Sequence, residues 1–299
     1  DTANMPDHEI LWTYIWNWMR GNPNRYAHRE KNAPERFSLD ELNHQLLSSE
    51  PKERLRAANE IGFLGANNCS SEGIVSALLK TLRDDDYEPV RLNAVYALGA
   101  IGSVAKEPLL NLLNEDEEFF SIDPVTHVSI AAHGLGAIGT IAIDSLEEKL
   151  TASKEQTRAW AAYALGEIGR AASTALPSLL EAASDSSPDV RRHVLSAIGI
   201  IATCSDDVEA TLVERLQQET DSQLRQYVLQ AMFRIGPSSA KYVPIIARFL
   251  DDDDGYVGAY TAEQLYRTAS PEAYSELLPY LRRQRWFPDG PHSKKEQVD

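Results

Sequence analysis

The chain has 299 residues and a formal net charge of −16. Such a charge would repel bare nucleic acid unless one face were locally basic, and no apolar stretch approaches the roughly 20 residues of a membrane-spanning helix. We therefore expect neither nucleic acid nor a membrane as a partner. A compact fold of this length usually divides into two domains, unless the chain is a repeat array that grows without a larger core.

The cysteines and the acidic runs do not form the pattern of a disulfide framework or a metal site. Cys69 and Cys204 lie far apart in the sequence. The acidic runs at 84–86, 115–118 and 251–254 lack the spacing of a calcium loop, so we interpret them as solvated turns and helix caps. With no secretory signal visible, we expect a reducing, cytoplasmic compartment, no metal and no cofactor.

The first predicted element is a tryptophan-rich helix. Trp12, Ile15, Trp16 and Met19 recur at helical spacing, and residues 21–34 have the turn residues and charge of a linker. We therefore expect residues 1–37 to form an N-terminal helix and linker, which either cap the array that follows or dock on an upstream domain. Because the first residue is Asp rather than Met, we expect a processed chain or a piece of a longer one.

A motif of twelve residues then recurs along residues 38–285. The clearest copies read RLRAANEIGFLG (54–65), RLNAVYALGAIG (91–102), VSIAAHGLGAIG (128–139) and RAWAAYALGEIG (158–169). Weaker copies occupy residues 191–202, 225–236 and 258–269. The first glycine falls at 62, 99, 136, 166 and 199, and Phe233 and Tyr266 take its place in the last two copies. A period in this range is typical of solenoid proteins.

Each repeat has the pattern of two helices. Apolar residues recur three and four apart in both halves, and an acidic break that often carries proline separates them. We therefore predict an all-α, right-handed superhelical solenoid of about seven antiparallel helix pairs, with Leu98, Leu135 and Leu165 buried. The glycines should let neighbouring helices approach closely, and the last glycine of each motif should cap its helix. Residues 286–299 are expected to form a flexible tail.

The repeat resembles the HEAT family, and within it the phycobilisome-lyase-like repeats. The residues that carry the resemblance are the pairs Val90-Arg91 and Val190-Arg191, followed by Ala-Leu-Gly-x-Ile-Gly at 97–102 and 164–169. The resemblance covers roughly residues 38–283, and it implies a solenoid whose second helices line a concave side. The third repeat departs from it at Val128 and the seventh at Gly258.

Two register columns on the predicted second helices carry large aromatic and polar side chains. The columns lie three residues apart, so they share one helix face. Tyr, Trp and His combine contact area with a polar tip, which suits recognition surfaces. The rings could instead pack between adjacent repeats. The candidate partner-binding residues in these columns are Tyr96, His133, Trp160, Tyr163, His193, Tyr227 and Tyr260.

A ladder of arginines follows the acidic turns of five repeats, at positions 54, 91, 158, 191 and 225. We expect these side chains to pair with Asp or Glu in or next to each repeat rather than to contact nucleic acid.

The pattern favours a protein–protein interaction scaffold over an enzyme. His133 and His193 lie two repeats apart, too far to share a metal ion, and the His8-Glu9 pair lies outside the array. The partner would be another protein, one with a basic surface being favoured by the acidic loops, or an upstream domain of the same polypeptide. The resemblance leaves a tetrapyrrole (bilin) lyase-like enzyme or its subunit as an alternative. A second alternative comes from residues 1–36, which resemble the tail of phytanoyl-CoA dioxygenase-type oxygenases. The chain would then be the C-terminal accessory domain of a longer iron/2-oxoglutarate oxygenase.

Overall fold

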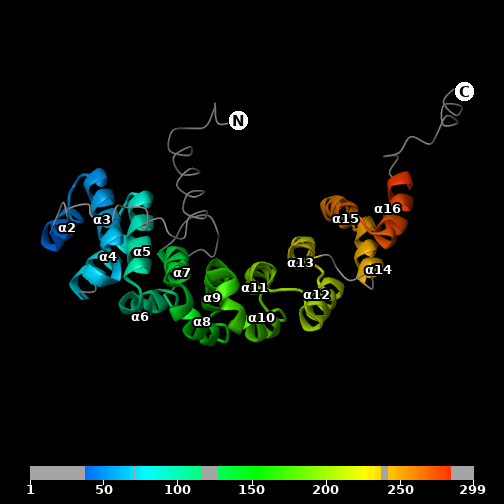
Figure 1. The fold of residues 1–299 in the computed structure, drawn as a ribbon, viewed down its shortest axis with the longest axis horizontal. Coiled ribbons are helices and arrows are strands. Elements are labelled where there is room, and N and C mark those ends of the chain that lie inside the picture. The colour runs from blue at the N-terminus through cyan, green and yellow to red at the C-terminus, as the bar shows by residue number, and fades with distance from the viewer. Residues whose placement is uncertain (1–37, 70–71, 116–126, 237–241, 284–299) are drawn as a thin grey trace, which may run out of the picture. The chain divides into compact units, whose positions relative to one another are not determined.

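The computed structural model describes residues 38–69, 72–115, 127–236 and 242–283 (Figure 1). All regular structure in these segments is helical, without a strand among them, as the sequence predicted. The predicted N-terminal helix of residues 1–37 and the tail of residues 286–299 lie outside the described residues, so both stay predictions.

The first of two compact units runs from Asp1 to Ala172. Its second helices pack on one another in chain order, and each also contacts its own first helix (Figure 1). The helix pairs are α2 (Leu39–Gln45) with α3 (Pro51–Cys69), α4 (Glu72–Asp84) with α5 (Glu88–Ile101), α6 (Ser103–Leu112) with α7 (His127–Ile138), and α8 (Ile143–Lys149) with α9 (Glu155–Ile168). The short 3-10 segment η1 (Gly139–Ala142) precedes α8.

The second unit runs from Ser173 to Asp299. It repeats the same arrangement, with α11 packed on α13 and α13 on α15. After the 3-10 segment η2 (Gly169–Ala175), its elements are α10 (Leu176–Ala182), α11 (Pro188–Ile201), α12 (Asp206–Gln218), α13 (Ser222–Ile235), α14 (Val243–Ile246), η4 (Ala247–Asp251), α15 (Gly255–Thr268) and α16 (Pro271–Arg283). The predicted solenoid of helix pairs is therefore confirmed.

The motif leucines form the core, as predicted. Leu98, Leu135 and Leu165 are each 0% exposed. Alanines of the same motifs, such as Ala97, Ala131 and Ala164, are buried as well. A helix pair cannot bury such a face by itself, so stacking of successive repeats completes the core.

The first motif glycine lets the second helices approach closely. A Cβ atom added to Gly99 would lie 2.5 Å from the Cβ atom of Ala137, and one added to Gly199 would lie 2.9 Å from the Cα atom of Ala231. Real Cβ atoms do not come this close, so a larger residue would push the helices apart. The predicted role of these glycines is confirmed.

The last motif glycine ends the second helix with a positive φ. Gly102 has φ 83° and ψ −127° and is the C-cap of α5, and Gly169 ends α9 with φ 72°. The last repeat has Ala269 at this position, in the left-handed region with φ 51°. These backbone angles are favourable for glycine and strained for any other residue, which explains the residue type in the motif.

Replacing Gly102 with alanine should therefore lower the free energy of unfolding by about 1–3 kcal/mol, because alanine cannot adopt this backbone conformation without strain. Chemical denaturation of the two proteins measures the difference. Gly73→Ala is a matched control of opposite sign. Gly73 is in helix α4 with open space around its Cα atom, so the change should stabilise the chain by up to about 1 kcal/mol. An equal effect of the two substitutions would contradict the conclusion that the backbone conformation at position 102 requires glycine.

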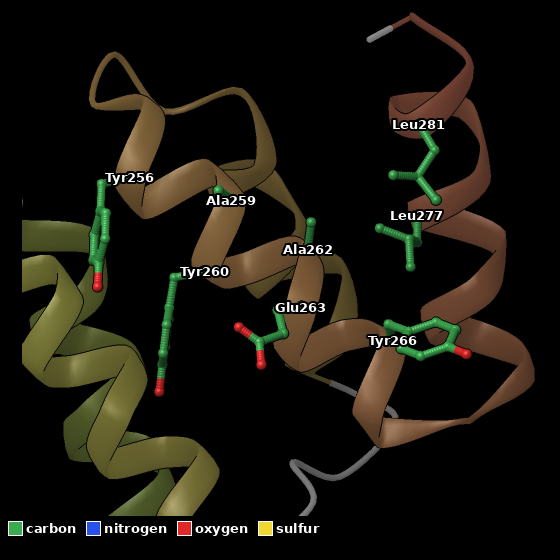
Figure 2. A pocket seen from close by; sticks show the side chains of 8 residues that line it. All are labelled: Tyr256, Ala259, Tyr260, Ala262, Glu263, Tyr266, Leu277 and Leu281. Carbon is green, nitrogen blue, oxygen red and sulfur yellow. The ribbon is translucent and has the colours of Figure 1, made fainter. Parts of the chain in front are cut away.

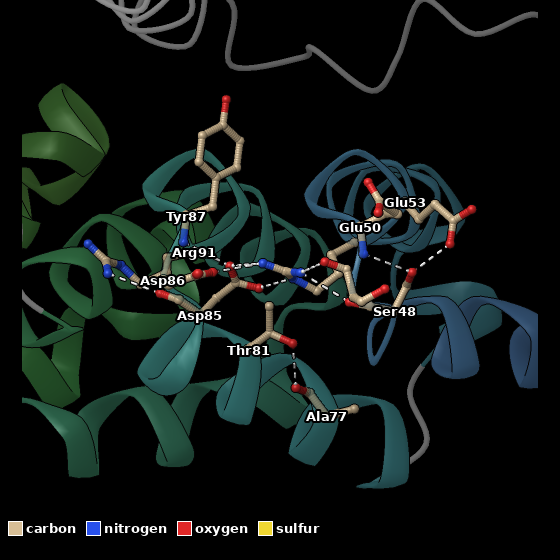
Figure 3. A network of polar contacts seen from close by, with 11 residues as sticks. Ser48, Glu50, Glu53, Ala77, Thr81, Asp85, Asp86, Tyr87 and Arg91 are labelled. Carbon is tan, nitrogen blue, oxygen red and sulfur yellow. Dashed lines mark hydrogen bonds and ion pairs between the residues drawn. The ribbon is translucent and has the colours of Figure 1, made fainter.

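The arginine ladder joins successive repeats, as predicted for its pairing with acids. Arg54 contacts Asp85 with Nε–Oδ2 2.6 Å and donates to the carbonyl oxygens of Ser48 and Ser49 (Figure 3). Arg54 thus bonds its own turn and the acid of the next turn. The side-chain exposure of Arg54 and Asp85 is 12% and 4%, so this pair is largely buried.

The same arrangement recurs in the second unit. Arg191 contacts Glu219 with Nε–Oε1 2.7 Å, and Arg225 contacts Asp252 with Nε–Oδ2 2.8 Å. Arg191 also donates to the carbonyl oxygens of residues 185 and 186. At Arg54, Arg191 and Arg225 the ladder is therefore a structural feature of the repeat, because these guanidinium groups bond the acid of the next turn.

Among the described residues, one segment, Val128–Lys149, is long and apolar enough to cross a membrane by length and composition alone, which differs from the expectation from the sequence. In the structure it comprises α7, η1 and α8, with a glycine of positive φ, Gly139, where α7 ends. More than half of its apolar window is buried inside the protein. These properties are those of core helices, which pass the same test.

Candidate functional site

In the first unit, α7 and α9 bring four polar and aromatic side chains into contact. The Tyr163 ring lies edge-on to Trp160, with centroids 5.6 Å apart, and edge-on to His133, with centroids 5.0 Å apart. The Tyr163 hydroxyl is 3.3 Å from Nδ1 of His133. Glu167 Oε2 is 3.6 Å from the same Nδ1 atom. The repeat register places these residues together, because α7 and α9 are packed side by side.

Burial divides this cluster into an inner and an outer part. Trp160 is 3% exposed and His133 is 9% exposed, so both are buried. Tyr163 and Tyr96, which occupies the same column on α5, are half-buried. Trp160 and His133 thus act as supports that hold the Tyr163 ring in one orientation, and the tyrosines are the parts that a partner could touch.

The predicted residues of the second unit divide in the same way. His193 is 5% exposed, whereas Tyr227 and Tyr260 are half-buried. Burial, with Arg192 beside it, lowers the pKa of His193 to about 3, so the imidazole is neutral at physiological pH. Burial likewise raises the pKa of the Tyr260 hydroxyl, which stays protonated. The Phe233 ring of α13 lies 6.4 Å from that of Tyr260.

The two columns are therefore not one continuous exposed strip. Trp160, His133 and His193 are packed inside the protein, which is the alternative that the sequence left open for these rings. Tyr96, Tyr163, Tyr227 and Tyr260 keep part of their surface accessible. Whether a partner binds them stays a prediction.

The column residue Tyr260 also lines an apolar groove beside α15 and α16, whose other lining residues the columns did not identify. The groove has a volume of about 480 Å³ and is lined by Tyr256, Ala259, Tyr260, Ala262, Glu263, Tyr266, Leu277 and Leu281 (Figure 2). Tyr256 and Tyr266 are 65% and 64% exposed. One sequence signal was available, because Tyr266 takes the place of a motif glycine. Nothing in the sequence indicated that Leu277 and Leu281 of α16 would line the groove, since this depends on how the last helices pack.

No cluster of three or more His, Cys, Asp and Glu side chains that could hold a metal ion occurs within the described segments. The arrangement of tyrosines with supporting His, Trp and Phe rings is suited to contact with another molecule. Each ring offers a flat apolar face and a hydroxyl that can donate or accept a hydrogen bond.

A protein-family model for HEAT repeats matches residues 39–120 and 143–232, which together make up more than half of the chain. A search of curated proteins found no match. The comparisons give no support to the resemblance of residues 1–36 to oxygenases, since the HEAT match begins after them.

Several solved structures have a similar fold. The karyopherin Kap121p bound to the SUMO protease Ulp1p has a TM-score of 0.60 at 13% identity, covering 83% of this chain and 30% of that chain. An engineered protein has a TM-score of 0.45 at 18% identity, covering 81% and 71%. The complex of CpcE and CpcF of phycocyanin lyase from Nostoc sp. PCC7120 has a TM-score of 0.40 at 21% identity, covering 54% and 99%. At 13% identity the match to Kap121p concerns the fold alone.

Proposed function

Because the chain belongs to the HEAT repeat family, we propose that it is a scaffold that binds another protein. The binding surface would be formed by the half-buried tyrosines of its second helices, Tyr96, Tyr163, Tyr227 and Tyr260. The HEAT solenoid is a general protein-interaction fold, and Kap121p is bound to the protein Ulp1p in its solved complex. The observation that carries the proposal is the Tyr163 ring, which is half-buried and held between two buried aromatic side chains.

A ring held in this way favours binding for a physical reason. Interface energy concentrates in a few aromatic and arginine anchors, and an anchor that is already ordered loses little conformational entropy on binding. Trp160 and His133 fix the orientation of Tyr163 before a partner arrives. The buried alanines and leucines already complete the core of this repeat, so a half-exposed tyrosine is available for contact.

The net charge of −16 supports a partner with a basic surface. Long-range attraction between opposite charges speeds diffusional encounter more than it slows dissociation. Added salt should therefore reduce the association rate constant and leave the dissociation rate constant nearly unchanged, because salt screens charges that are separated by water.

Tyr163→Ala should weaken partner binding by about 2 kcal/mol, or roughly 30-fold, as expected for the loss of an aromatic anchor. The test is quantitative capture of proteins by the immobilised chain, followed by affinity measurement with each captured protein. Tyr87→Ala is the matched control, because Tyr87 is also a tyrosine of the first unit, is 40% exposed, and precedes α5 in the turn.

Circular dichroism must show the same helical signal for both variants. Proteins that bind the wild type and the Tyr87 variant, but not the Tyr163 variant, would support the proposal. Equal capture by all three proteins would place the binding surface elsewhere and contradict it.

A further inference from the structure

The groove beside α15 lies on the side where another second helix packs in the inner repeats. Gly99 and Gly199 hold this register position in α5 and α11, and they contact Ala137 and Ala231 of the following second helix. In α15 the position is held by Tyr266, which is 64% exposed. Its large exposed fraction makes this face accessible to another molecule.

Two tyrosines and a carboxylate share one face of α15 at this groove. Tyr256, Tyr260 and Glu263 are spaced four and three residues apart, which places them on one side of a helix. Figure 2 shows the hydroxyls of Tyr256 and Tyr260 pointing the same way, and the Glu263 carboxylate directed toward Tyr260. The Phe233 ring supports Tyr260 from α13. The faces of tyrosine rings are electron-rich and attract cations.

The groove also offers one carboxylate that can accept hydrogen bonds from a cation. Glu263 is the one charged residue among those that line it. Its carboxylate lies 3.7 Å from Arg267, and the two side chains are 59% and 68% exposed, so this pair is weak and solvated. Asp253 and Asp254 lie just before Tyr256 in the chain and add negative charge. A cationic ligand would have to compete with Arg267, and with Arg234 on α13, for the Glu263 carboxylate.

We infer that the groove binds an arginine side chain presented by a protein partner. The guanidinium stacks on Tyr256 and Tyr260 and donates hydrogen bonds to the Glu263 carboxylate. Apolar side chains next to that arginine pack on Leu277 and Leu281. Arginine fits better than lysine because its guanidinium is planar and weakly hydrated, so that it stacks on rings while it hydrogen-bonds in its own plane. This inference rests on the proposed function, since it assigns the chemistry of the partner.

The test uses the full chain and the peptide acetyl-Leu-Gly-Arg-Gly-Leu-amide. The comparison peptide carries citrulline, a neutral side chain of nearly the same shape, in place of arginine. Calorimetric titration should give an affinity about tenfold higher for the arginine peptide, because citrulline loses the cation–ring and carboxylate interactions. The lysine peptide should bind with intermediate affinity.

Variants identify the site without relying on loss of binding alone. Glu263→Gln and Tyr256→Leu should each weaken arginine-peptide binding by about three- to tenfold, and both residues are exposed enough for substitution without loss of fold. Arg267→Gln should strengthen binding by about two- to fivefold, because it removes the competing guanidinium. A gain in affinity cannot result from unfolding. Tyr87→Ala, at an exposed residue of the first unit, should leave peptide binding unchanged.

Equal affinity for the arginine and citrulline peptides would overturn the inference, as would unchanged binding in both the Glu263 and the Arg267 variants. Peptide binding that weakens as the protein concentration rises would show a second copy of the chain in the groove, and this result would overturn it too. Failure of the peptide, with loss of captured partners in the Tyr163 variant, would refute this site and leave the proposed function standing. The reverse pattern would refute the Tyr163 face alone.

Discussion

Arg191→Met is expected to lower the free energy of unfolding by about 3–5 kcal/mol, because it leaves a buried carboxylate without its partner. The Glu219 side chain is only 4% exposed, and it accepts from both Nε and Nη2 of Arg191 at 2.7 and 3.0 Å. The same substitution removes two hydrogen bonds to the turn before α11. Chemical denaturation followed by circular dichroism measures the change.

The matched control is Arg267→Met, which removes an arginine from an exposed pair. Arg267 and Glu263 are more than half exposed, so we expect a change of no more than about 0.5 kcal/mol. Adding Glu219→Gln to Arg191→Met should recover part of the lost stability, since the buried charge is then gone as well. Similar losses for the Arg191 and Arg267 variants would mean that the ladder does not stabilise the repeat through burial.

Leu165→Ala is expected to lower the free energy of unfolding by about 2–5 kcal/mol, the usual range for a large-to-small change in a packed core. Leu165 is 0% exposed and lies in α9, which packs against α7 and α8. The loss has two contributions: less apolar surface is buried on folding, and a cavity remains in the core. Denaturant titration of the purified variant provides the measurement.

Leu47→Ala makes the same chemical change at a site that is 69% exposed, in the turn between α2 and α3. It should change the free energy of unfolding by less than about 0.5 kcal/mol. A loss for Leu165→Ala as small as that of this control would show that the motif leucine is not a core residue.

The repeat motif by itself determined the fold of the described residues. The buried face was readable because leucine and alanine recur at helical spacing in every copy, and only stacking can cover such a face. The glycine at position 102 was readable as a helix end, because positive φ strongly favours glycine. Three ladder arginines, Arg54, Arg191 and Arg225, form the ion pairs that their positions after acidic turns predicted.

Only the tertiary structure decided which aromatic side chains are accessible. Trp160 and Tyr163 lie three residues apart on one helix face, yet the first is buried and the second is half-buried. Helical spacing fixes the direction of a side chain to within a face, whereas its exposure depends on how closely the neighbouring helix approaches. The groove beside α15 depends on the same property, since Leu277 and Leu281 come from α16 and meet Tyr256 and Glu263 only after the two helices have packed.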